Sequence, residues 1–163
     1  MTIDPTARYT NIRARVTGYL TGLTVSGSPS WVTELGQPVG ATRWARITYV
    51  PIRETWAGRY TGSQIVADSR ILVVIDLFYE QADTGASVDL YAVDRAADDV
   101  AHGLRSLALS LLDYSSTPAA PTTVSGARIF VVEPPTITRL DPSGGRARRQ
   151  VSAELRWYLR HAA

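Results

Sequence analysis

Few residues in this sequence have the types and spacing that catalysis or metal binding requires. The two histidines, His102 and His161, lie far apart, and neither belongs to a carboxylate motif with metal-ligand spacing. His102 follows Asp98 by four residues, so a surface pair on one helix explains its position. Asp94, Asp98 and Asp99 could form an acid–base set, but helical spacing places them on a polar, solvated face. The sequence therefore predicts neither a metal site nor an acid–base centre.

Absent residue types and motifs exclude further chemistry. The chain has no cysteine, which excludes disulfides, thiolate nucleophiles, Cys-ligated zinc and iron–sulfur clusters. All 17 basic residues are arginine, which excludes the lysines of P-loop enzymes, kinases and Schiff-base enzymes. Neither a Gly-x-Ser-x-Gly elbow nor a Gly-x-Gly-x-x-Gly fingerprint occurs. We expect a protein that is not an enzyme and needs no cofactor.

One stretch has the composition of a binding surface. Arg53–Gln64 is predicted to be a polar connection with interspersed glycines, and it carries Arg53, Trp56, Arg59 and Tyr60. Aromatic side chains and arginine are the favoured anchors of protein interfaces. The alternative is that both rings fold back onto a sheet.

A second stretch is rich in arginine. Gly144–Arg149 combines two glycines with Arg146, Arg148 and Arg149, so its N–H groups and guanidinium groups could hold a phosphate. A flexible hairpin tip would have the same sequence. The segment from Arg139 to the last residue contains six arginines and two acids, a net charge of +4, whereas the rest of the chain has a net charge of −2. This asymmetry fits either a patch for an acidic partner or nucleic acid, or one solvated strand face.

The first element that could position these stretches is a helix. Asp4 provides an N-cap and Pro5 suits the first helical position. Apolar residues then recur at helical spacing, at Tyr9, Ile12, Val16, Leu20 and Leu23. We expect a turn-rich linker over Thr24–Ser30.

Strands are expected next, at Trp31–Leu35, Arg43–Ile52 and Ile71–Tyr79. Pro51 marks either the end of the second of these strands or an edge position in the sheet. Ile71–Tyr79 is apolar on both faces except at Asp76, which predicts a central strand.

A long helix and a strand-rich end complete the chain. Ser87 is the expected N-cap, and an apolar stripe at helical spacing runs from Leu90 to Leu111. Ser115–Gly126 is expected to be a loop. The last strands are predicted at Ala127–Glu133, Thr136–Leu140 and Val151–His161, with the final two forming a hairpin around the turn Asp141–Gly145.

This order predicts an α+β fold in one domain over residues 1–163. We expect an antiparallel or mixed sheet flanked on one side by a short N-terminal helix and one long central helix. The longest unbroken apolar run, Ile71–Ile75, is far shorter than the ~20 residues of a membrane-spanning helix, and no signal peptide is visible. We therefore expect no membrane partner.

The pattern resembles the tail terminator, or tail completion, proteins of long-tailed bacteriophages and gene transfer agents. The resemblance rests on the order of the elements, their size and the character of four strand segments: Trp44–Val50, Ser69–Ile75, Ala127–Glu133 and Leu155–Tyr158. It covers most of the chain.

The resemblance implies a structural virion protein at the tail–neck junction, present in the host cytoplasm during assembly. Such proteins form a homo-hexameric ring that caps the tail tube, ends its polymerisation and offers a surface to the head–tail connector or head-closure protein. DNA would pass through the lumen without sequence-specific binding. We expect Arg53–Gln64 and the tip Asp141–Gln150 on the two axial faces of the ring, an assignment that comes from local chemistry.

Two other functions remain open from the residues. The chain could be another neck or tail component, such as a head-closure or tube-like protein. It could also be a nucleic-acid-binding α+β domain that uses the C-terminal arginines, in which case binding would fall steeply with salt.

Overall fold

The computed structural model describes most of the backbone and a smaller set of side chains. The backbone is described over residues 5–34, 36–61, 64–80, 88–113, 122–141 and 145–162. Within these ranges the side chains of 5–11, 53–61, 64–68, 111–113, 122–127 and 158–162 are not described.

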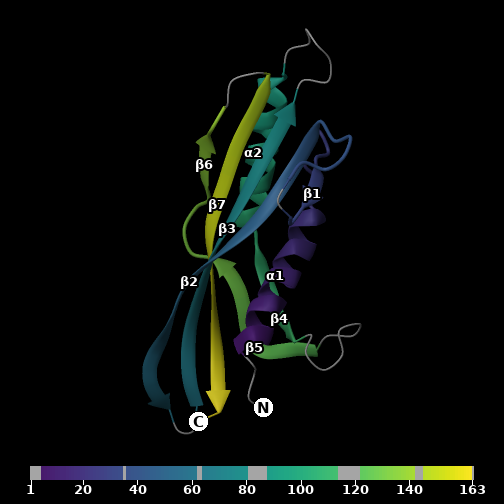
Figure 1. Ribbon diagram of the computed structural model, residues 1–163. Helices are drawn as coiled ribbons and strands as arrows, with labels where there is room; N and C mark the ends of the chain where they lie inside the picture. The colour runs from purple at the N-terminus through teal and green to yellow at the C-terminus, as the bar shows by residue number, and fades with distance from the viewer. Residues whose placement is uncertain are drawn as a thin grey trace.

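The described elements form one mixed sheet with both helices on the same side (Figure 1). In chain order they are α1 (Pro5–Thr21), β1 (Ser30–Val32), β2 (Arg43–Thr61), β3 (Gln64–Glu80), α2 (Leu90–Arg105), β4 (Ala108–Asp113), β5 (Thr122–Val131), β6 (Thr136–Arg139) and β7 (Arg146–Ala162). The strand order is β1-β2-β3-β7-β5-β4, and β6 also pairs with β7. Only the β1–β2 pair is parallel among these strands. The predicted α+β class is confirmed.

Helix α1 follows the predicted apolar stripe. Its described backbone begins at Pro5, and Ile12, Val16 and Leu20 are fully buried on its inner side. The helix ends at Thr21, where Gly22 and Leu23 donate backbone hydrogen bonds to the carbonyls three residues earlier. Such a tight last turn is a common helix ending. Leu23 then packs against the same core.

Strand β3 lies at the centre of the sheet, as its sequence predicts. It pairs with β2 on one side and with β7 on the other, from Gln64–Ala162 to Glu80–Arg146 without a register shift. Successive side chains of a strand alternate between faces. On the helix side of β3 this buries Ile71, Val73, Ile75 and Leu77.

The predicted polar connection Arg53–Gln64 is wrong. Strand β2 continues through Pro51 to Thr61, and β3 begins at Gln64. The ladder accommodates this with register shifts between Ile52 and Thr55 and between Ala57 and Thr61. Bulges of this kind absorb irregular spacing, and the threonine and aromatic residues of the stretch suit a strand.

Pro51 occupies the edge position that the sequence offered as one alternative. Glu80 donates a backbone hydrogen bond of 2.7 Å to the carbonyl of Thr42. Hydrogen-bonded pairs alternate along an antiparallel ladder, so even-numbered residues of this part of β2 bond to β3. Pro51 is odd-numbered and pairs with Ile71, and β1 covers β2 only from Trp44 to Arg46. The missing N–H of Pro51 therefore faces the outer edge and costs the ladder nothing.

Helix α2 is shorter than predicted at both ends. Its N-cap is Asp89, whose carboxylate accepts from the N–H of Ala92 at 3.1 Å, and not Ser87, which lies outside the described residues. The helix ends at Arg105, and Ala108–Asp113 forms β4. The apolar run of this region fits a helical stripe and a buried strand equally well, and pairing with β5 selects the strand.

The C-terminal strands confirm one prediction and correct two. Strand β6 pairs with β7 from Thr136–Ser152 to Arg139–Arg149, which is the predicted hairpin. Strand β7 begins at Arg146, five residues before the predicted Val151. The predicted loop Ser115–Gly126 is wrong from Thr122 onwards, where β5 begins with β-branched residues, and residues 114–121 lie outside the described part. No helix in the described part of the chain is long and apolar enough to cross a membrane.

A substitution at Gly27 tests whether the linker after α1 contacts the sheet at Tyr79. Gly27 has a φ of +79°, and a Cβ there would lie 2.9 Å from the Tyr79 hydroxyl. Gly40 has a φ of +73° but nothing within 4 Å of its added Cβ. We expect Gly40→Ala to cost about 1 kcal/mol of unfolding free energy from backbone strain, and Gly27→Ala to cost about 2 kcal/mol more from overpacking. Urea unfolding of both variants would measure the difference, and equal losses would contradict the described contact.

Candidate functional site

One face of the sheet has no helix against it in the described part of the chain (Figure 1). We call this surface the open face. Its side chains come from alternate residues of the three long strands: Trp44, Arg46, Thr48, Val50 and Ile52 of β2, Arg70, Leu72, Val74, Asp76, Phe78 and Glu80 of β3, and Arg146, Arg148, Gln150, Ser152, Glu154 and Arg156 of β7. The intervening residues form the core beneath the helices.

A buried carboxylate anchors one end of the open face. Asp76 is only 4% exposed. It accepts hydrogen bonds from Arg46 at 3.3 Å, from both Nε and Nη2 of Arg148 at 3.1 and 2.8 Å, and from Gln150 at 3.0 Å. Arg46 and Gln150 are its direct neighbours in the register of β2 and β7. The carboxylate is fully occupied by donors, so this cluster stabilises the sheet and is not arranged for proton transfer.

Aromatic rings extend this cluster along the sheet. Trp44 and Phe78 stack with centroids 4.9 Å apart and planes 15° apart. The guanidinium groups of Arg46 and Arg148 lie 5.4 and 5.2 Å from the Phe78 ring, and that of Arg146 lies 5.7 Å from the Trp44 ring. These distances suit cation–π attraction. The long side chains thus cover this end of the sheet themselves, without a helix.

The middle of the open face is apolar and accessible. Val50 and Ile52 are 45% and 37% exposed, and Leu72 and Val74 beside them are half-buried. An ion pair between Arg70 and Glu154, 3.1 Å apart, marks the other end. An apolar centre between charged ends is the usual composition of a protein–protein contact surface.

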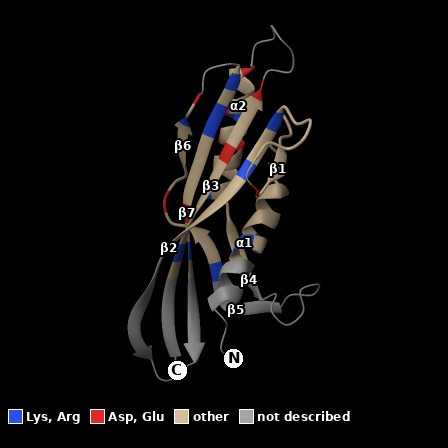
Figure 2. Ribbon diagram, in the orientation of Figure 1, with Lys and Arg blue, Asp and Glu red and all other residues tan. Residues whose placement is uncertain are grey.

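Two of the predicted site arginines of β7 are already paired within the chain, in a part of the sheet where basic and acidic positions lie on neighbouring strands (Figure 2). Arg146 forms an ion pair with Glu80, and Arg148 with Asp76. Arg146 is the first residue of β7 and is exposed, and Arg148 lies two residues further along the strand, each beside a carboxylate distant in sequence. Their part in an interface stays a prediction. The charge asymmetry along the chain is largely balanced in space by these pairs.

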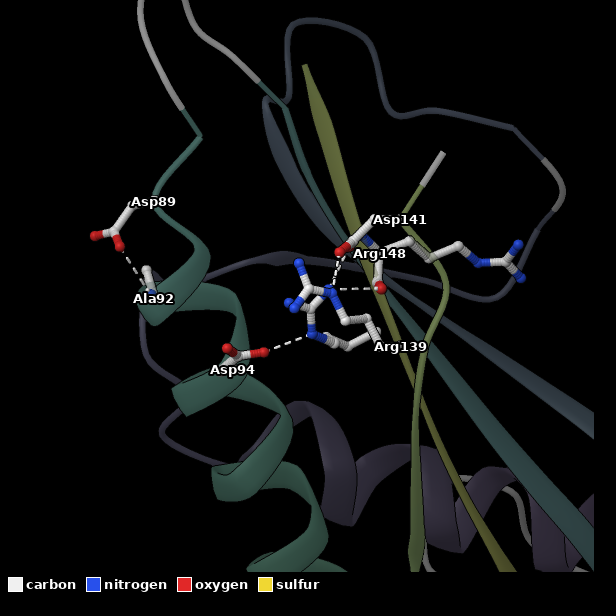
Figure 3. A network of polar contacts seen from close by, with 7 residues as sticks. Asp89, Ala92, Asp94, Arg139, Asp141 and Arg148 are labelled. Carbon is white, nitrogen blue, oxygen red and sulfur yellow. Dashed lines mark hydrogen bonds and ion pairs between the residues drawn. The ribbon is translucent and has the colours of Figure 1, made fainter. Parts of the chain in front are cut away.

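Arg149 points to the helix side and is buried. It is 2% exposed, and its guanidinium bonds to Asp94 of α2, to Asp141 and to the carbonyl of Arg148 (Figure 3). It therefore cannot contribute to an exposed interface or phosphate site, which corrects its prediction. A buried guanidinium held by two carboxylates instead ties α2 to β7 and to the segment that follows β6.

Asp141 has a perturbed acidity. Burial alone would raise its pKa, but hydrogen bonds from the side chain of Arg139, the N–H of Arg148 and the side chain of Arg149 outweigh this and hold the pKa below its ordinary value. The carboxylate is thus stabilised in its ionised form.

The predicted solvated acids of α2 differ from one another. Asp98 and His102 are exposed, as expected. Asp99 instead accepts hydrogen bonds from the N–H and hydroxyl of Ser26 at 2.9 and 2.7 Å, and Asp94 bonds to Arg149. The Tyr79 hydroxyl donates to the carbonyl of Ser26, and burial raises the pKa of Tyr79 to about 12. The contacts that Asp99 and Tyr79 make with Ser26 dock the linker after α1 on α2 and on the sheet.

The remaining predicted site residues can be placed only by their backbone. Arg53, Trp56, Arg59 and Tyr60 belong to β2, but their side chains lie outside the described residues. Their role in binding stays a prediction. Within the described part of the chain, no group of three histidines or acids lies together as metal ligands would. The sequence did signal the Asp76 cluster, since Asp76 is the one charge in an otherwise apolar strand segment.

Removing the Asp76 carboxylate tests the charged cluster. We expect Asp76→Ala to lower the unfolding free energy by about 3 kcal/mol, because two arginines lose their buried counter-ion. Glu154→Ala on the same face removes a half-exposed partner and should cost less than about 1 kcal/mol. Chemical denaturation of both variants is the measurement. A similar loss of unfolding free energy in the two variants would show that burial of the Asp76 ion pairs adds nothing to stability.

Asp141 gives a prediction with a defined pH dependence. Its pKa is lower in the folded chain, so it stabilises the fold above its unfolded pKa, and this contribution is lost as the pH falls through the folded pKa. Asp141→Asn should cost about 2 kcal/mol near pH 7. The difference from the wild type should shrink below about pH 4. Urea unfolding at several pH values tests this, and a constant difference would contradict it.

No family model and no curated protein matches this chain. Among solved structures, a protein of unclear function is similar over 95% of this chain and 96% of its own, with a TM-score of 0.50 and 12% identity. At this identity the similarity shows the fold alone. The arrangement of helices and strands is therefore shared with another protein over nearly its whole length.

Proposed function

We propose that this protein is a structural subunit of a phage-type tail or a related gene transfer agent. Six copies would form a ring on the last ring of the tail tube, stop its polymerisation and present a surface to the head–tail connector. The support is the resemblance in element order and strand character, together with an α+β fold that fits it.

The observation that carries the proposal is the exposed apolar middle of the open face. Val50, Ile52, Leu72 and Val74 lie together there with no helix against them in the described part of the chain. Contiguous exposed apolar surface in a protein that needs no further core is characteristic of assembly contacts. A ring subunit requires such a surface, whereas an isolated domain gains nothing from it.

The shape of the sheet gives further support. Strands β2, β3 and β7 continue together past the remaining strands as a three-stranded arm (Figure 1). In β2 the pairing with β1 ends at Arg46, and in β7 the pairing with β5 ends at Arg156. From these residues toward the end of each strand, the described pairings of β2 and β7 are with β3 alone. A projecting arm is suited to reach a neighbouring ring or the connector. It includes the backbone of Trp56 and Tyr60, which we retain as candidate anchors.

Nucleic-acid binding has weaker support. A DNA-binding face needs guanidinium groups available for phosphates. Arg146, Arg148 and Arg149 are instead engaged by Glu80, Asp76, Asp94 and Asp141. Passage of DNA through the lumen of a ring needs no specific contact with these residues.

Native mass spectrometry and a capping assay test the proposal. We expect a closed hexamer of about 107 kDa, six times 17.8 kDa, either free or after mixing with tail tubes. Added protein should also stop the elongation of polymerising tube protein. A stable dimer that neither binds tubes nor limits their length, but binds DNA with strong salt dependence, would overturn the proposal.

The arm can be tested in the same assay. Trp56→Ala combined with Tyr60→Ala should leave folding intact and reduce co-sedimentation with tail tubes by about tenfold, a typical loss for aromatic anchors. Val39→Ala, which changes a fully exposed residue outside the arm, is the matched control. Unchanged co-sedimentation of the double variant would remove the arm from the contact.

A further inference from the structure

We draw no further inference here: the strongest candidate, the apolar patch of Val50, Ile52, Leu72 and Val74 on the open face of the sheet, belongs to the surface already described, and nothing in the structure shows what covers it.

Discussion

The unbroken pairing of β3 with β7 is the constraint on which the rest of the structure depends. It runs from Gln64–Ala162 to Glu80–Arg146 and joins residues more than 60 positions apart without a bulge. Because side chains alternate along a strand, this register decides which residues enter the core and which reach the open face. A slip of β7 by one residue against β3 would turn Val151 to the open face and Arg148 beneath the helices. The free energy required to expose apolar side chains to water disfavours such a slip and so fixes the register.

Ion pairs stabilise the fold on both sides of this ladder. On the open face Asp76 gathers Arg46 and Arg148 across three strands. On the helix side Arg149 joins Asp94 to Asp141. Removal of one partner from such a group costs more than the pair itself contributes, because the other charge stays buried. The arginines at the end of the chain therefore serve first to fix the orientation of α2 and β7.

The sequence predicted the parts of the fold that depend on periodicity. The stripe through Ile12, Val16 and Leu20, the central strand and the last hairpin all follow from local spacing. Predictions failed where one local pattern fits two structures. The apolar run at the end of α2 fits helix and strand, and only pairing with β5 decides between them.

The site was harder to predict than the fold. Arg148 and Arg149 could be recognised as an arginine cluster, but their partners Asp76 and Asp94 lie 72 and 55 residues away in sequence, so no spacing rule reveals these two pairs. Asp76 was visible as the charge that interrupts an apolar strand, although its partners were not. The proposed function depends on surfaces between copies. A single sequence records such surfaces only as exposed apolar residues without an internal role.

The position of Pro51 also has a consequence for amide hydrogen exchange. In this part of β2 the N–H groups of Thr48 and Val50 lie in the ladder with β3, and Pro51 brings no N–H to the outer edge. The amides of Thr48 and Val50 should therefore exchange slowly with solvent. The side chain of Val50 is nevertheless 45% exposed. Side-chain burial and amide protection are thus independent properties along this edge.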